Sequence, residues 1–448
     1  MSFPRYPKYR HSGEHRLGLV PEHWKSIRLK NVLQQRVTDG PHTTPSFLDE
    51  GVPFLSVDGI QEGELRFDGC RFVSHEDHAE FKRKAAPRRN DILMGKAAST
   101  GKIARVKVDF EFSIWSPLAL IRINSTAADP AFVEYALKCP VAQAQVDNFC
   151  TYNTQKNISM DDIPRLVLAC PSLPEQRHIA AFLDHETAKI DALVEEQKRL
   201  IELLKEKRQA VISHAVTKGL NPNAPMKDSG VEWVGEVPAH WDFLRVKAAS
   251  TFLTSGPRGW SDHVSDDGAI FVQSGDLTES LGIDFDNAKR VVVTDDAEAK
   301  RTQLKVGDVL VCITGAKTGK VAVCEQIDEP AFINQHICLI RPAACLRPTY
   351  LGAYLHSAAG QRYFELAQYG LKQGLSLENV KQAAVPVPPR PEQDHIVDYV
   401  NRFATELDDL CAAAKMSIAL LHERRTALIS AAVTGKIDVR RAAAESSV

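Results

Sequence analysis

The sequence predicts an α+β protein made by tandem duplication of one mixed α/β domain. A long helix is expected after each copy, and the two helices are expected to pair as an antiparallel coiled coil. Two observations predict this fold. Sequence motifs recur once at a spacing of 217 residues, and an apolar repeat of period 3.5 follows each copy. A sustained repeat of that period requires a partner helix.

Length and composition exclude several classes of protein. The 448 residues suit two or three domains, and 44% hydrophobic with 25% charged residues excludes a largely disordered chain. No apolar run approaches the ~18–20 residues of a membrane span, so we expect no membrane partner. Nine cysteines without a CxxC pair fit a reducing, cytoplasmic setting and argue against a zinc ribbon. A net charge of −2 leaves any nucleic-acid role to local patches.

The duplication is visible in several motifs. Gly18-Leu-Val-Pro-Glu-His-Trp24 returns as Gly235-Glu-Val-Pro-Ala-His-Trp241, and Pro174-Glu-Gln returns as Pro391-Glu-Gln. Residues 174–219 and 391–436 align without a gap and share 19 identities in 46 positions. Solenoid repeats span only ~20–50 residues, so this spacing indicates two copies of a whole unit.

Each unit divides into an α/β domain and a helix. Short strands are expected near residues 52–57, 91–94 and 103–106, with counterparts near 269–273, 308–311 and 321–323. We therefore expect five segments: a first domain at 1–172, a first spacer helix at 173–218, a second domain at 219–389, a second spacer helix at 390–438 and a C-terminal tail at 439–448.

Proline-rich breaks set the start of both long helices. Steps of four and three residues from Ile179 and from Ile396 select the positions expected to face the partner helix. The expected interface consists of Ile179, Leu183, Ile190, Leu193, Leu200, Leu204, Val400, Phe403, Leu407, Leu410, Leu421 and Leu428.

No catalytic motif is present in the sequence. Gly315-Ala-Lys-Thr-Gly-Lys320 is one residue shorter than a phosphate-binding P-loop, and its copy at 95–102 is one residue too long. Both segments are better interpreted as tight hairpin turns that carry a lysine. No GxGxxG, HExxH or GxSxG motif occurs, and the histidines lack metal-ligand spacing. We expect no catalytic residue, bound cofactor or metal in this chain.

Two polar loops differ between the copies. Thr38-Asp-Gly-Pro-His-Thr-Thr44 corresponds to Thr254-Ser-Gly-Pro-Arg-Gly-Trp260, and residues 152–157 correspond to 369–374. A shared frame with different polar loops is typical of two readers of different sequences, because these side chains can contact base edges and phosphates. The candidate DNA contacts are His42, Thr43, Thr44, Lys96, Ser99, Lys102, Asn153, Gln155, Lys156, Arg258, Trp260, Lys317, Lys320, Lys372 and Gln373. Alternatively, Trp260 packs in the domain core.

Three features carry a resemblance to a known family: Lys227-Asp-Ser-Gly-Val-Glu-Trp-Val-Gly-Glu-Val-Pro-Ala-His-Trp241, the two Pro-Glu-Gln motifs, and Ala210-Val-Ile-Ser-His-Ala-Val-Thr217 with its copy at 427–434. In these features the chain resembles the specificity subunits of type I restriction-modification enzymes, and the resemblance covers nearly its whole length. The first copy departs from the opening pattern, since Glu14-His15-Arg16 stands where the second has Val231-Glu232-Trp233.

The resemblance implies a non-catalytic subunit with two target recognition domains, each reading half of a split, asymmetric site in double-stranded DNA. The helices would set the gap between half-sites and dock two methyltransferase subunits that carry S-adenosylmethionine. Motor-nuclease subunits that use ATP and Mg²⁺ would join them in a bacterial or archaeal cytoplasm. The alternatives are a duplicated coiled-coil adaptor that binds protein without DNA readout, and a nuclease with an unrecognised site.

Overall fold

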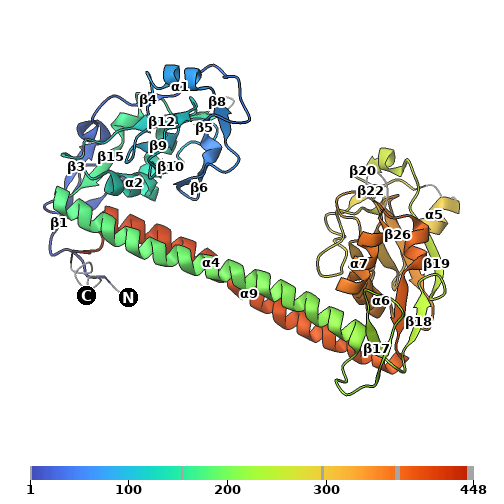
Figure 1. The fold of residues 1–448 in the computed structure, drawn as a ribbon. Helices are drawn as coiled ribbons and strands as arrows, with labels where there is room; N and C mark the ends of the chain where they lie inside the picture. The colour runs from blue at the N-terminus through green and yellow to red at the C-terminus, as the bar shows by residue number, and fades with distance from the viewer. Residues whose placement is uncertain (1–2, 153–154, 294–296, 369–373, 441–448) are drawn as a thin grey trace. The chain divides into compact units, whose positions relative to one another are not determined.

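The computed structural model describes residues 3–152, 155–293, 297–368 and 374–440. The chain forms two compact units, unit 1 at 1–197 with 416–448 and unit 2 at 198–415. The long helices α4 (Leu173–Lys218) and α9 (Arg390–Val433) are each divided between the units (Figure 1). Each unit therefore contains one α/β domain and part of both long helices.

The two α/β domains share the order of their central antiparallel sheet. In unit 1 the order is β10 (Ile103–Arg105), β9 (Ile92–Gly95), β12 (Leu118–Ile121) and β4 (Thr38–Asp39). In unit 2 the matching order is β24 (Val321–Val323), β23 (Val309–Cys312), β26 (Ile337–Pro342) and β19 (Ser250–Ser255). The strands predicted near 91–94, 103–106, 308–311 and 321–323 belong to these sheets.

A second small sheet mixes parallel and antiparallel pairs in each domain. Unit 1 has β11 (Ser113–Ile114), β5 (Val52–Leu55) and β8 (Arg71–Val73). Unit 2 has β20 (Val264–Ser265), β22 (Lys289–Val291), β21 (Ala269–Val272) and β25 (Ala331–Ile333). The pairs β11–β5 and β21–β25 are parallel. The predicted mixed α/β duplication is confirmed by these matching sheets.

Short strand pairs and helices complete each domain. In unit 1 they are β1 (Tyr9–His11) with β2 (Leu19–Pro21), β3 (Lys25–Arg28) with β15 (Val167–Cys170), β6 (Ile60–Gln61) with β7 (Glu64–Leu65), β13 (Thr151–Tyr152) with β14 (Lys156–Asn157), and α1 (His75–Phe81), α2 (Pro130–Lys138) and α3 (Pro140–Phe149). In unit 2 they are β16 (Met226–Asp228) with β17 (Glu236–Pro238), β18 (Asp242–Arg245) with β27 (Ala384–Val387), and α5 (Ala297–Thr302), α6 (Pro348–His356), α7 (Ala358–Ala367) and α8 (Leu377–Gln382).

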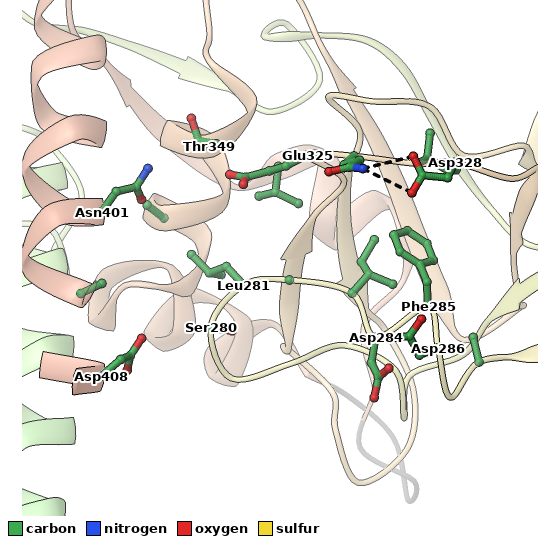
Figure 2. Close-up of a pocket in the computed structure, with 18 of the residues that line it drawn as sticks. Ser280, Leu281, Asp284, Phe285, Asp286, Glu325, Asp328, Thr349, Asn401 and Asp408 are labelled. Carbon is green, nitrogen blue, oxygen red and sulfur yellow. Dashed lines mark hydrogen bonds between the residues drawn. The ribbon is translucent and has the colours of Figure 1, made fainter. Parts of the chain in front are cut away.

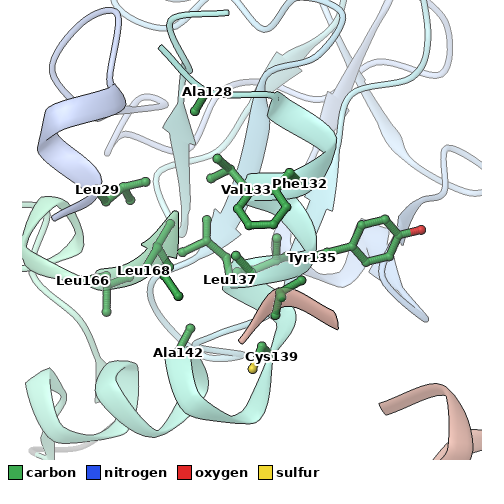
Figure 3. Packing of buried hydrophobic residues seen from close by; sticks show 14 of the residues in the cluster. Leu29, Ala128, Phe132, Val133, Tyr135, Leu137, Cys139, Ala142, Leu166 and Leu168 are labelled. Atoms are coloured by element: carbon green, nitrogen blue, oxygen red, sulfur yellow. The ribbon is translucent and has the colours of Figure 1, made fainter. Parts of the chain in front are cut away.

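Each α/β domain packs against both long helices through its main hydrophobic core. In unit 1 the α2 residues Phe132 and Leu137 lie in this core (Figure 3), together with Ile179 of α4 and Ile429 of α9. In unit 2 the corresponding core contains Ile212 and Val216 of α4 and Ile396 and Val400 of α9. Burial of this apolar surface on two helices at once fixes where each domain attaches to the helix pair.

The repeated Pro-Glu-Gln motif has a structural role. The buried Glu175 carboxylate accepts hydrogen bonds from Tyr6 Oη at 2.8 Å and from Trp24 Nε1 at 3.2 Å. Gln176 Oε1 accepts from the Asp129 backbone N–H at 2.9 Å, and its Nε2 donates to the Pro171 carbonyl. These bonds tie the start of α4 to the loop before α2. In unit 2 Gln393 Oε1 accepts from the Arg347 backbone N–H at 2.8 Å and its Nε2 donates to the Pro388 carbonyl, so the glutamine of the motif makes the same junction in both units.

The long helices pair antiparallel. In unit 1 the first part of α4 packs beside the last part of α9, where Arg425 Nε lies 3.2 Å from Asp191 Oδ1. In unit 2 the last part of α4 packs beside the first part of α9, where Arg208 Nη2 lies 3.8 Å from Asp408 Oδ2. Of the expected interface, Ile179, Leu183, Ile190, Leu204, Val400 and Leu407 are buried, whereas Phe403, Leu421 and Leu428 are half-buried.

The structure corrects three expected interface positions. Leu193, Leu200 and Leu410 are 43%, 41% and 53% exposed. On α4 the buried positions are instead Val194 and Ile201. After Leu183 the next buried position is Thr187, four residues further on, where the predicted alternation takes a step of three. The predicted positions Leu193 and Leu200 therefore lie one residue away from the buried ones.

The far end of the described chain returns to unit 1. The Asp438 N–H donates to the Pro4 carbonyl at 2.7 Å, Tyr9 Oη donates to the Gly435 carbonyl, and Val439 is buried. Within the described ranges, no helix combines the length and apolarity that crossing a membrane requires.

Candidate nucleic-acid interface

The glycine-containing segments 95–102 and 312–320 are hairpin turns, as their sequence suggested. They connect β9 to β10 and β23 to β24, which pair antiparallel. Gly101 has φ +93° and Gly319 has φ +91°, a conformation that favours glycine. The Gly101 N–H donates to the Gly95 carbonyl, and the Gly319 N–H donates to the Cys312 carbonyl. The glycine before each lysine is therefore explained by a tight turn and does not require a bound nucleotide.

The Gly-Pro pairs mark a close backbone crossing in each unit. A Cβ atom on Gly40 would lie 1.8 Å from the Ile114 carbonyl oxygen, and one on Gly256 would lie 2.2 Å from the Ile333 carbonyl oxygen. Only glycine fits such positions. The segment after each Gly-Pro pair is exposed, which includes His42, Thr43 and Thr44 in unit 1 and Arg258 in unit 2.

Three polar loops meet in unit 1. Lys96 Nζ of the hairpin turn lies 2.9 Å from Asp39 Oδ2 of the Gly-Pro loop. The Ile158 N–H donates to the Lys96 carbonyl, and Thr100 Oγ1 donates to the Lys156 carbonyl at 2.7 Å. Loops 38–44 and 95–102 and the described residues 151–152 and 155–158, which are separate in sequence, therefore form one surface. We define it as the unit 1 loop surface.

A buried carboxylate organises the cations of the unit 1 loop surface. The Asp39 side chain is 4% exposed and pairs with Lys84, Lys96 and His42. Burial opposes ionisation of Asp39, but hydrogen bonds from Lys84 and Lys96 outweigh it and lower the pKa of this carboxyl. One anion thus holds three basic side chains together. Lys84 was not among the predicted contacts, because it follows α1 and is distant in sequence from both polar loops.

The other candidate residues of unit 1 are distributed around this surface. Lys102 and Gln155 are exposed, Ser99 is half-buried, and Lys156 pairs with Asp147. Lys96 itself is only 13% exposed, so its charge acts mainly on Asp39. Asn153 lies outside the described residues, as do Lys372 and Gln373 of unit 2.

Unit 2 builds its loop surface with different side chains. Arg301, from α5, donates to the Ser255 carbonyl at 3.0 Å and to Thr254 Oγ1. Trp260 packs against Phe332 and Phe271 with ring centroids 5.7 and 6.3 Å apart, which fits the packing alternative better than a free stacking platform. Arg258 remains exposed beside it. The two copies of the Gly-Pro loop therefore differ in both charge and shape.

The turn lysines of unit 2 have partners within the domain. Lys317 is exposed and donates to the Gly275 carbonyl at 3.2 Å. Lys320 is 17% exposed and lies 2.7 Å from Glu279 Oε1. Lys320 is therefore paired with a carboxylate of a neighbouring hairpin, and this pairing disfavours its assignment as a phosphate contact.

Asn334, Gln335 and His336 complete the loop surface of unit 2. His336 Nδ1 hydrogen-bonds Thr314 Oγ1, and the Ile313 N–H donates to the His336 carbonyl at 2.8 Å. Thr314 also bridges to Gly374. These residues were not among the predicted contacts, although Asn-Gln-His between two apolar strands is a signal present in the sequence. We define the unit 2 loop surface as residues 254–260, 312–320 and 334–336.

A separate cleft in unit 2 carries the opposite charge. It has a volume of about 820 Å³ and lies between segments 280–290 and 325–329 and the long helices (Figure 2). Its charged lining residues are Asp284, Asp286, Glu325, Asp328, Glu329, Asp408, Arg208 and Arg290. The excess of carboxylates repels a phosphate backbone, so DNA contact is better assigned to the loop surfaces. In the described part of the chain, no cluster of three His, Cys, Asp or Glu side chains could hold a metal ion.

Comparison with known proteins identifies matching sequences and folds. The family described as "Type I restriction modification DNA specificity domain" matches residues 21–203 and 264–416. The specificity subunit of the type I restriction enzyme EcoKI from Escherichia coli K12 is 22% identical, over 94% of this chain and 90% of that protein. The EcoBI specificity subunit from Escherichia coli is 24% identical, over 73% of this chain and 72% of its own length.

Two solved structures share the fold. One, from work on complex assembly and conformational transition of the type I R-M system, has a TM-score of 0.70 at 18% identity and covers 92% of this chain and 98% of its own. The HsdS subunit from Thermoanaerobacter tengcongensis has a TM-score of 0.51 at 16% identity, with coverage of 93% and 98%. At these identities the likeness supports the fold alone.

Proposed function

Because the chain belongs to the family of type I restriction-modification DNA specificity proteins, we propose that it reads a bipartite, asymmetric site in double-stranded DNA. Each unit would read one half-site through its loop surface. The observation that carries this proposal is the contrast between a repeated frame and unlike loops. Asp39 with Lys84 and Lys96 in unit 1 is replaced by Ser255 with Arg301 in unit 2.

The long helices would serve as the spacer and as the docking site for partner subunits. They expose large apolar side chains that the antiparallel pairing leaves uncovered: Leu193, Leu200, Leu203, Leu410, Met416 and Leu420. Exposed apolar side chains concentrated on two helices favour a protein partner. We propose that two methyltransferase subunits bind here and that motor-nuclease subunits join them. S-adenosylmethionine, ATP and Mg²⁺ would bind those partners, in the cytoplasm of a bacterial cell.

The direct test is reconstitution with the methyltransferase subunit. The complex should methylate one split DNA sequence, whereas the purified chain alone should show no methyltransferase, nuclease or ATPase turnover. DNA affinity should fall steeply as salt is raised, because basic side chains release counterions from phosphates. A chain that binds the partner but gives the complex no DNA sequence preference would instead be an adaptor. Metal-dependent cutting by the chain alone would indicate a nuclease.

The spacer role has its own test. Because each domain packs on both α4 and α9, seven residues must be added to both helices at facing positions, after Val194 in α4 and at the matching level of α9. Seven residues lengthen a helix by ~10.5 Å, which corresponds to about three base pairs. The methylated site should gain that spacing while both half-sites stay unchanged. An unchanged spacer in an active complex would contradict the spacer role.

A further inference from the structure

In unit 2 the α/β domain also contacts the long helices at a place away from its apolar core. In unit 2 this second contact is the hairpin whose ends are bridged by Leu277 and Ile283. Arg208 of α4 donates from Nη1 to the Glu279 carbonyl of this hairpin at 3.3 Å. The cleft of about 820 Å³ adjoins this contact, and Figure 2 shows hairpin residues Ser280 and Leu281 near Asp408 of α9. The hairpin therefore contacts α4 at the edge of this cleft.

Arg208 connects three segments of unit 2. Its side chain is 19% exposed, and Nη2 lies 3.8 Å from Asp408 Oδ2 on α9 while Nη1 reaches the hairpin. Within the described chain its Nε is buried and makes no hydrogen bond. A guanidinium loses hydration at such a site, and its planar fork is suited to hold two partners at once. Apolar packing alone would not need an arginine at this position.

Unit 1 repeats the arginine–aspartate pair with the helices exchanged. Arg425 stands 217 residues after Arg208, and Asp191 stands 217 residues before Asp408. Arg425 Nε lies 3.2 Å from Asp191 Oδ1, and the arginine side chain is 22% exposed. With residues 62–64 of the β6–β7 hairpin, Arg425 lines a cleft of about 480 Å³. The basic residue thus comes from α4 in unit 2 and from α9 in unit 1.

We propose that Arg208 and Arg425 are positioning residues that fix the orientation of each recognition domain on the helix pair. This inference rests on the proposed function and deepens it. The apolar core and the Pro-Glu-Gln junction attach each domain near one end of the helix pair, about which the domain can rock. The contact of Arg208 with the hairpin limits that motion in unit 2, and Arg425 stands at the matching place beside the β6–β7 hairpin in unit 1. Since rocking displaces the loop surface relative to the helices, these arginines set how strictly the spacer length is read.

The experiment measures methylation by the reconstituted complex on duplexes whose spacer is one or two base pairs shorter or longer than the natural one. The wild-type complex should strongly prefer one spacer. Arg208→Met and Arg425→Met should each weaken that preference roughly tenfold, the factor carried by one charge-assisted hydrogen bond, and leave both half-sites unchanged. Matched controls are Arg290→Met, at the same cleft but paired with Glu329, and Arg89→Met, paired with Asp109. Both controls should keep the wild-type preference.

Asp408→Asn and Asp191→Asn decide the matter if an arginine variant fails to fold, because these carboxylates are 57% and 55% exposed. The two aspartate substitutions remove the ionic partner of each arginine but keep the arginine side chain in place. They should therefore also weaken the spacer preference. The inference is overturned if arginine and aspartate variants keep the wild-type spacer preference, or if they change a half-site. Failure of the proposed function is distinct, since the wild-type complex itself would then methylate no split site.

Discussion

Unit 1 and unit 2 share their internal frame and differ at their loop surfaces. In both units an arginine makes a bidentate contact with a buried aspartate beside the central sheet, Arg122 with Asp91 and Arg341 with Asp308. At the Gly-Pro loop, by contrast, unit 1 has the buried Asp39 with its basic partners, and unit 2 has Arg301 on Thr254 and Ser255. The comparison teaches that duplication preserved the arginine–aspartate pairs beside the central sheet and altered the side chains of the Gly-Pro loop.

The frame itself differs at one informative place. Trp24 donates from Nε1 to Glu175 at 3.2 Å, whereas Trp241 Nε1 is buried and, in the described part of the chain, makes no hydrogen bond. Glu392, the counterpart of Glu175, pairs with His240 at 2.7 Å, just as Glu175 pairs with His23 at 3.0 Å, so only the tryptophan bond differs. The same tryptophan thus has a polar role in unit 1 and a packing role in unit 2.

The largest effect should come from the repeated arginine–aspartate pairs. Arg341→Met leaves Asp308, whose side chain is 1% exposed, without its bidentate partner, and Arg122→Met does the same to Asp91. Each change should cost about 3–5 kcal/mol, because a buried charge loses its compensation. Urea unfolding followed by hydrogen exchange in each unit measures the loss. Arg89→Met, at an exposed pair, is the control and should cost under ~1 kcal/mol; equal losses in all three variants would contradict a shared buried frame.

The loops should respond differently from the frame. Arg258→Ala should weaken binding by roughly 1–3 kcal/mol and relax one position of the half-site read by unit 2, if the exposed guanidinium reads a base. Trp260→Ala should mainly lower the melting temperature, because this ring packs on Phe332 and Phe271. A methylation profile and a melting curve for each variant separate the two effects. If either variant changed the half-site read by unit 1, the result would contradict the proposal that the two units read DNA independently.

The sequence predicted the duplication, the paired helices and the α/β class because repeats and apolar periodicity are visible along the chain. It also located the Gly-Pro loops and hairpin turns. It could not place Lys84 or His336, since their approach to the loops depends on the packing of distant segments. It misplaced Leu193 and Leu200 because one extra step of four at Thr187 shifts the buried face, which no local motif marks.

The two tryptophans allow a matched test of about 1 kcal/mol. Trp24→Phe removes a hydrogen bond to the buried Glu175, whereas Trp241→Phe removes a donor that has no partner among the described residues. The loss of ring volume is common to both. The free energy of unfolding should therefore fall further for Trp24→Phe, by about 1 kcal/mol. Equal losses would show that the two junctions do not differ as their contacts indicate.

The smallest expected effect concerns acid stability of the unit 1 loop surface. The pKa of Asp39 is lowered in the folded protein by Lys84 and Lys96, so its carboxylate stabilises the fold above its unfolded pKa of about 3.8. That contribution is lost as pH falls below this value. Asp39→Asn should therefore lose more stability at pH 7 than at pH 3, measured by thermal melting at both values. Asp49→Asn, at an exposed carboxylate of the same unit, serves as control; a loss that does not depend on pH would contradict the ionic role of Asp39.

The central claim is that two similar units read two different half-sites. Single-molecule mapping of methylated bases in the host genome, with and without this chain, tests it most directly. The account predicts one class of methylated site that depends on the chain, with two unlike half-sites separated by a spacer of fixed length and free sequence. A palindromic site, a single uninterrupted site, or a methylation pattern unchanged by removal of the chain would contradict it.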